Sequence, residues 1–194
     1  MAVELRKGQK VNLVKGGKSL GEILINLNWS QPKRGFFFKP KGIDLDLGCL
    51  YELKSGAKGC VQALGNAFGK LKAVPYVALD GDDRTGEAAG GENLRVNGEM
   101  ISHIRRLLIY TFIYEGVANW KQADGVVTIR CPGSEGVIVR MDEYATSQRM
   151  CAIAMLENSN DETFSVEKIV RFFNGHEAMD KAFGWGLRWK PGRK

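Results

Sequence analysis

The chain has few histidines, few prolines and no long hydrophobic run. Its 194 residues include two histidines and five prolines. His103 and His176 do not lie next to serine or cysteine in a known nucleophile motif, so the sequence offers little support for an enzyme. No secretory signal precedes the first expected strand, and no apolar run is long enough to cross a bilayer. These absences predict a non-enzymatic, cytoplasmic protein without a transmembrane segment.

The four cysteines also lack the spacing of a metal centre. They stand singly at Cys49, Cys60, Cys131 and Cys151, without a CxxC pair. Each lies in an apolar or strand-like context, which favours reduced thiols packed in a core over a metal or disulfide framework.

Hydrophobic periodicity predicts a fold made mainly of β-strands. Apolar residues alternate with other residues over 23–29, 137–141 and 164–172, and residues 107–114 are apolar on both faces. Two short helices are expected, one at 99–104 after Asn97 and one near the C-terminus at 177–183 before Gly184. Short strands separated by turns indicate a two-sheet β-sandwich, and the length favours a single domain over residues 1–194.

An acidic, glycine-rich segment at residues 80–92 stands out in a chain of formal net charge +6. Five carboxylates would repel one another there if the segment were compact, with Arg84 as the one basic residue in it. Ca²⁺ would remove that repulsion, because it accepts six to eight oxygen ligands from flexible loops. The carboxylates are Asp80, Asp82, Asp83, Glu87 and Glu92.

The segment is not an EF-hand, because Arg84, Thr85 and Gly91 occupy its fifth, sixth and twelfth positions when it is counted from Asp80. Segments rich in aspartate and glycine also form solvated turns, and this interpretation stays open. A third hypothesis is a metal-dependent hydrolase, in which the segment holds Mg²⁺ for phosphoryl chemistry. Against it, no basic residues that could clamp a phosphate are adjacent.

A second acidic pair lies on the expected strand at residues 43–47. Ile43, Leu45 and Leu47 share one face of this strand, which leaves Asp44 and Asp46 together on the other face. The two carboxylates either supply further calcium ligands to the acidic segment or lie on a solvent-facing side of the sheet.

The acidic segment resembles the signature of the TerD-like family, the calcium-binding tellurium-resistance and stress-response proteins of bacteria. The Thr85-Gly86-Glu87 turn is its most specific part. The last residues also resemble the TerA-type branch of that family. The matching stretches are 3–8, 11–15, 27–29, 43–50, 82–87, 90–97, 107–113, 127–130 and, for the TerA-type branch, 183–189.

The resemblance implies a calcium-binding scaffold that acts in tellurite resistance and the stress response. It also implies partners among other tellurium-resistance proteins, with a position peripheral to the inner membrane left open. The segment departs from the family pattern at Ala88 and Ala89 and in its short Gly90-Gly91 run, which implies fewer ligands or a weaker site. The implied metal ligands are Asp44, Asp46, Asp80, Asp82, Asp83, Thr85, Glu87 and Glu92.

Basic residues at both ends of the chain support a different hypothesis. Residues 1–41 carry nine basic and two acidic side chains, and the last residues add further cations. Phe36–Phe38 or Trp189 could stack on bases between these cations, as in a nucleic-acid-binding protein, or the same surface could dock on an anionic membrane. The candidate basic surface consists of Lys33, Arg34, Lys39, Lys41, Arg188 and Lys190.

Overall fold

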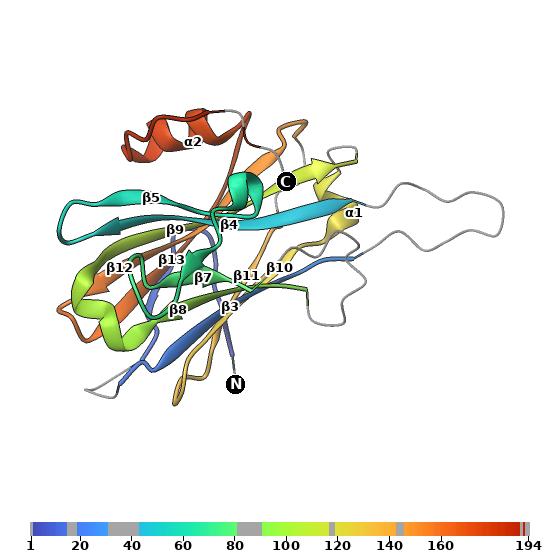
Figure 1. The fold of residues 1–194 in the computed structure, drawn as a ribbon. Coiled ribbons are helices and arrows are strands. Elements are labelled where there is room, and N and C mark those ends of the chain that lie inside the picture. The colour runs from blue at the N-terminus through green and yellow to red at the C-terminus, as the bar shows by residue number, and fades with distance from the viewer. Residues whose placement is uncertain are drawn as a thin grey trace.

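Two β-sheets pack face to face in the computed structural model, which describes residues 2–14, 19–30, 43–80, 91–116, 119–142, 146–190 and 192 (Figure 1). The predicted sandwich is therefore confirmed. Among the described residues, every neighbouring strand pair is antiparallel except the parallel pair that β1 makes with β11.

The described strands divide into a seven-stranded and a six-stranded sheet. The first has the order β1 (Val3–Glu4), β11 (Val137–Arg140), β10 (Val126–Arg130), β3 (Glu22–Asn28), β8 (Glu92–Asn97), β7 (Val77–Leu79) and β6 (Gly69–Lys70). The second has the order β2 (Lys10–Asn12), β13 (Thr163–Phe173), β12 (Met150–Ser159), β9 (Ile104–Glu115), β4 (Asp44–Leu53) and β5 (Lys58–Val61).

The helices of the described chain are short. The 3₁₀-helix η2 (Gly98–His103) replaces the helix predicted at 99–104, and the Asn97 side chain caps it by accepting from the Glu99 backbone N–H at 3.2 Å. The C-terminal helix α2 (His176–Phe183) is confirmed and ends at Gly184 with φ of 66°. The others are η1 (Leu64–Asn66) and α1 (Trp120–Ala123). In the described ranges, none of these helices has the length and apolar character needed to cross a bilayer.

The main hydrophobic core lies between the two sheets. Alternate residues of β3, such as Ile23 and Ile25, point inward and are fully buried, as the period-two pattern predicts. Leu45 and Leu47 of β4 belong to the same core. Burying side chains of this size stabilises the fold by about 1.5–3 kcal/mol each.

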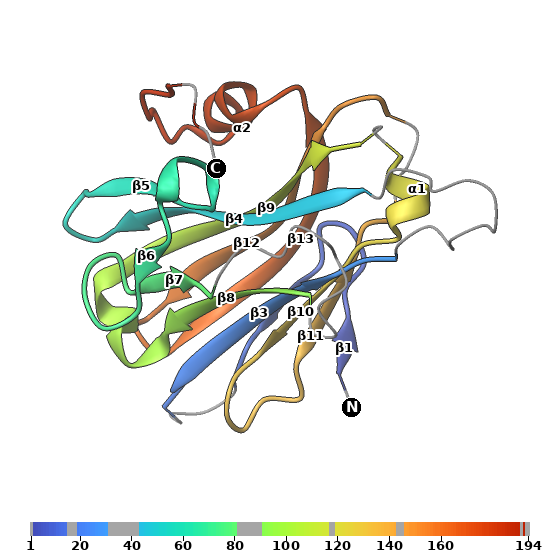
Figure 2. The same ribbon diagram turned by 45° about the vertical axis from the view of Figure 1, so that its right-hand side comes forward.

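A second apolar cluster covers the outer face of the six-stranded sheet. It joins Leu50, Leu108 and Phe112 of that sheet to Met179 of α2 and Trp185 of the following segment. Figures 1 and 2 show α2, in red, lying over this outer face. We call residues 176–190, which comprise α2 and the segment after it, the C-terminal cap.

Gly48 allows close packing beneath this second cluster. It pairs with Tyr110 across β4 and β9, and a Cβ atom at Gly48 would lie 2.4 Å from the ring of Tyr110, which is fully buried. We expect Gly48→Ala to lower the free energy of unfolding by about 1–3 kcal/mol, because the ring has little room to move. Urea denaturation measures this change. Gly175→Ala is the control, since a Cβ there meets no heavy atom within 4 Å; equal losses in both variants would contradict the prediction.

Candidate functional site

Two acidic residues of β4 are buried, although aspartate is seldom found inside proteins. Asp46 is 0% exposed and Asp44 is 8% exposed. The predicted alternation holds, because Ile43, Leu45 and Leu47 belong to the core between the sheets. The face that carries the two carboxylates is buried as well, so the alternative of a solvent-facing acidic strand is wrong.

Glu92 links the two sheets beside these carboxylates. It is the first residue of β8 and is 2% exposed. Its Oε2 atom accepts a hydrogen bond from the backbone N–H of Leu47 at 2.5 Å. Leu47 follows Asp46 directly, so this bond brings the last residue of the acidic segment to the strand that carries Asp44 and Asp46.

The two ends of the acidic segment lie side by side. The backbone N–H of Asp80 donates to the carbonyl oxygen of Asn93 at 2.9 Å. Both carboxylate oxygens of Asp80 accept from Nε of Arg95, at 2.6 and 2.8 Å, and Arg95 also pairs with Glu22. These hydrogen bonds raise the pKa of the Arg95 guanidinium. The Asp80 carboxylate is therefore already engaged in an ion pair on a partly exposed surface.

The middle of the acidic segment lies outside the described residues. This applies to Asp82, Asp83, Thr85 and Glu87. Within the described ranges, no group of three or more histidine, cysteine, aspartate or glutamate side chains is placed to hold a metal ion. The described residues contribute buried carboxylate oxygens, a donor type that suits a hard cation, but they do not form a complete ligand set.

The candidate basic surface is only partly described. Lys33, Arg34, Lys39 and Lys41 lie outside the described residues, as do Phe36–Phe38. Arg188 and Lys190 are exposed. Trp189, the proposed stacking residue between them, is half-buried: its Nε1–H donates to Asp180 at 3.1 Å and its ring lies 4.7 Å from that of His176. The indole is thus already packed within the C-terminal cap.

Asp180, which the sequence did not single out, and His176 make the polar contacts of the C-terminal cap. Asp180 is 4% exposed, and its carboxylate accepts from the backbone N–H groups of Gly186 at 2.7 Å and Leu187 at 2.9 Å, in addition to Trp189. Nε2 of His176 lies 2.9 Å from Oε1 of Gln62. The aromatic residues at 183–189 are the sequence feature that could have indicated that this segment packs on the sheet.

His176 reaches the sheet through an aromatic and polar network. The Tyr110 hydroxyl donates at 2.6 Å to the same Gln62 oxygen that His176 contacts. The His176 ring packs edge-on against Tyr110 and Phe112, with centroid distances of 5.6 and 5.1 Å. Burial lowers the pKa of His176 from 6.5 to about 4, so the imidazole is neutral at pH 7. Burial also raises the pKa of Tyr110 well above its usual value.

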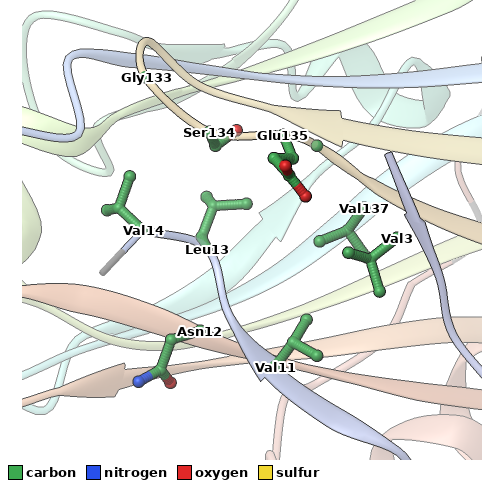
Figure 3. Close-up of a pocket in the computed structure, with 10 residues that line it drawn as sticks. Val3, Val11, Asn12, Leu13, Val14, Gly133, Ser134, Glu135 and Val137 are labelled. Atoms are coloured by element: carbon green, nitrogen blue, oxygen red, sulfur yellow. The ribbon is translucent and has the colours of Figure 1, made fainter. Parts of the chain in front are cut away.

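A separate pocket of about 540 Å³ opens between β1, β2 and residues 133–137 (Figure 3). Its lining is mostly apolar, with Val3, Val11 and Val137 around it and Glu135 of the connection between β10 and β11 beside it. Neither the buried carboxylates nor the C-terminal cap lines this pocket. It is therefore distinct from the acidic site at the ends of β4 and β8.

Two known proteins that resemble this chain in sequence are described as tellurium-resistance or stress-response proteins. A sequence model of the TerD domain matches residues 1–131. The tellurium resistance protein TerA of Alcaligenes sp is 49% identical over 182 residues, which cover 91% of this chain and 53% of that protein. The stress response protein SCP2 of Bacillus subtilis (strain 168) is 26% identical over 170 residues, covering 81% of this chain and 79% of SCP2. This chain thus spans about half the length of the Alcaligenes protein.

Solved structures share the fold. A homologue of the telluride resistance protein TerD, SCO6318 from Streptomyces coelicolor A3(2), superimposes with a TM-score of 0.58 at 15% identity, covering 83% of this chain and 95% of that one. SAV2460, a protein of unknown function, gives a TM-score of 0.62 at 12% identity, covering 88% and 100%. The TerD domain match and the Alcaligenes relative confirm the resemblance seen in the acidic segment. This chain belongs to the TerD domain family of tellurium-resistance and stress-response proteins.

Proposed function

We propose that this chain is a calcium-binding, non-enzymatic module of the tellurite-resistance and stress response. The observation that carries the proposal is the bond from the Leu47 N–H to Glu92, which joins the base of the acidic segment to the strand with buried Asp46. A binding role suits these residues because their carboxylates are enclosed in the fold, away from the open pocket near β1.

The chemistry of the side chains supports a hard cation at this place. Ca²⁺ prefers carboxylate and other oxygen ligands and accepts them in varied geometry. The buried Asp44, Asp46 and Glu92 lie at the base of a segment that carries further carboxylates. In the proposed site Asp46 and Glu92 are the central ligands, and Asp44, Asp82, Asp83, Thr85 and Glu87 complete the shell. Asp80 would join them only by giving up its ion pair with Arg95.

The proposed ion acts first on the structure of the acidic segment. It would hold together carboxylates that repel one another, so that residues 80–92 present one defined surface. We propose that this surface binds other tellurium-resistance proteins, and that the protein works in the cytoplasm with such partners at the inner membrane. The names of the TerA and SCP2 relatives support a role in resistance and stress rather than in a specific reaction.

Calorimetric titration of the metal-stripped protein tests the proposal. We expect saturable binding of Ca²⁺ in preference to Mg²⁺, with stabilisation of about 2.7 kcal/mol at a calcium concentration 100 times the Kd. Asp46→Asn and Glu92→Gln should each weaken binding by at least about 10-fold, because even the residues that only support metal ligands typically contribute 10- to 100-fold to affinity. Asp161→Asn is the matched control, because Asp161 is exposed and pairs with Lys54.

Two results would contradict the proposal. One is the absence of calcium-dependent heat and of any change in Tm; the other is unchanged affinity in both site variants. Glu92→Gln keeps an oxygen that can accept from Leu47, so a loss of affinity without unfolding would report on the metal. Oligonucleotide binding that falls steeply with salt and ignores chelators would instead favour the nucleic-acid-binding alternative.

A further inference from the structure

Two stretches of the chain contain basic residues but no acidic ones. Residues 53–79 carry four basic side chains, and residues 181–194 carry five. Acidic residues occur directly outside these stretches, at Glu52, Asp80 and Asp180. Each stretch is therefore cationic in a chain whose charges are otherwise mixed.

The structure places the two stretches side by side. Nζ of Lys58 on β5 donates to the backbone carbonyl oxygen of Trp185 at 3.2 Å. Gly192 lies against η1, since a Cβ atom there would be 3.5 Å from Cβ of Leu64. In Figures 1 and 2 the red C-terminal segment lies beside β5. Folding thus joins two cationic stretches that are far apart in the sequence into one surface.

Four cations of this surface have no carboxylate partner. Lys70, Lys72, Arg188 and Lys190 are exposed, and none of them forms an ion pair with another residue of the described chain. Their charges therefore remain available to an anion in solution or on another surface.

Glu52 borders this surface but is outnumbered by cations. It is 4% exposed, and its carboxylate lies 2.6 Å from Arg106, 3.1 Å from Arg105 and 3.8 Å from Lys58. Three cations and one carboxylate leave a net charge of +2, and the Arg105 side chain is 67% exposed. We call the following residues the basic patch: Lys58, Lys70, Lys72, Arg105, Arg188 and Lys190.

An exposed apolar side chain lies beside these cations. Val74 is 54% exposed, the largest fraction among the exposed large hydrophobic residues of the described chain. It lies on the connection between β6 and β7, two residues after Lys72 and four after Lys70. An apolar side chain next to lysines suits the boundary between lipid headgroups and acyl chains, where the ammonium groups can reach the phosphates.

The aromatic side chains of the two stretches argue against nucleic acid as the partner. Proteins bind single strands by stacking bases on accessible aromatic rings. In the described parts of both stretches, no aromatic side chain is exposed. The observations therefore favour a lipid bilayer. The aromatic residues are Phe68, Tyr76, Phe183, Trp185 and Trp189.

We propose that the basic patch and Val74 form a surface that binds anionic lipid bilayers. The inference rests on the proposed function for its place, the inner membrane, but it does not need the calcium site. Each basic side chain close to an anionic membrane contributes about fivefold to affinity. Several such side chains together give an attachment that salt weakens, because ions screen exposed charges.

Sedimentation with lipid vesicles tests this inference on the whole chain, with a chelator present throughout. One set of vesicles is phosphatidylcholine alone, and the other is phosphatidylcholine mixed equally with phosphatidylglycerol, which is anionic. We expect binding to the mixed vesicles and not to phosphatidylcholine alone, and we expect it to fall as salt is added.

Paired charge removals test whether both stretches belong to one surface. Lys70→Gln combined with Lys72→Gln should weaken binding to the mixed vesicles by about 25-fold, because two contributions of about fivefold are lost. Arg188→Gln combined with Lys190→Gln, in the other stretch, should cause a loss of similar size.

A matched control separates the basic patch from the net charge of the protein. Lys121→Gln combined with Arg130→Gln changes the net charge equally, at exposed positions outside the patch, and should bind nearly as the native chain does. Val74→Ser leaves every charge in place and should weaken binding by about fivefold, since it removes the apolar contact.

The outcomes separate this inference from the calcium proposal. Equal binding to both kinds of vesicle, or equal losses in the patch and control variants, would overturn it. So would binding to oligonucleotides but not to vesicles, with the loss confined to the patch variants. Vesicle binding by a chain that takes up no calcium would leave this inference standing, and calcium uptake without vesicle binding would overturn this inference alone.

Discussion

Ending the chain at residue 131, where the match to the TerD domain stops, is expected to abolish folding. The truncation removes β12 and β13, and β12 lies between β9 and β13 inside the six-stranded sheet. Side chains such as Ile153, Phe164 and Val166 belong to the main core. The truncation removes eight large apolar side chains of this core in all: Val137, Val139, Met141, Ile153, Leu156, Phe164, Val166 and Val170. Each contributes about 1.5–3 kcal/mol by burial, so their combined loss of roughly 12–24 kcal/mol is as large as the 5–15 kcal/mol by which a domain is stable.

Circular dichroism during thermal unfolding measures this loss. We expect no cooperative transition for the chain ending at 131, whereas a chain ending at residue 190 should keep the transition, since it retains both sheets and the C-terminal cap. A cooperative transition near the native Tm in the shorter chain would show that residues 1–131 fold alone. The experiment also tests the predicted single domain, for which the C-terminal strands must be part of the same folding unit.

Acidification from pH 7 to pH 5 is expected to reduce stability by about 2 kcal/mol through His176 alone. Its pKa is lowered from 6.5 to about 4 by burial, so the folded chain binds the proton more weakly than the unfolded chain does. The unfolded state takes up more protons between these two values, and stability therefore falls as pH falls through this window. Below about pH 4 the total loss levels off at about 3 kcal/mol.

Urea denaturation at several pH values isolates this contribution by comparison with His176→Phe. The variant cannot take up the proton, so the difference in unfolding free energy between native chain and variant should change by about 2 kcal/mol from pH 7 to pH 5. Other titrating groups cancel in that difference. A constant difference over the pH range would mean that His176 is not held in its neutral form by burial.

Period-two alternation was enough to place strands that are buried on one face. It correctly predicted strands at β3, β11 and β13, where each inward side chain alternates with a more exposed one. The apolar, aromatic run at 107–114 correctly predicted the middle of β9, which extends further at both ends. The strand β12 was not predicted. Residues 150–156 are all buried, so no alternation marks them, and methionine and alanine also suit helices.

Alternation also predicted one part of the candidate site, the pair of acids on the strand at 43–47. Alternation placed Asp44 and Asp46 on one face of a strand, but it could not tell whether that face met water or another layer of the protein. The answer came from the tertiary structure, in which both aspartates are buried and Glu92, 46 residues further along the chain than Asp46, bonds to the neighbouring Leu47. Asp80 also gained a partner, Arg95, that no local pattern indicated.

The sequence by itself determined the family, the β-rich class and the acidic segment, because these depend on residue types and short-range spacing. Only the tertiary structure decided that the acids of β4 are buried, that Glu92 bonds to Leu47, that Asp180 joins α2 to the segment after it, and that His176 of the cap meets Gln62. The physical reason is the separation along the chain over which each effect acts. Alternation and turn chemistry act over a few residues, whereas burial and hydrogen-bond partners depend on which distant strands become neighbours.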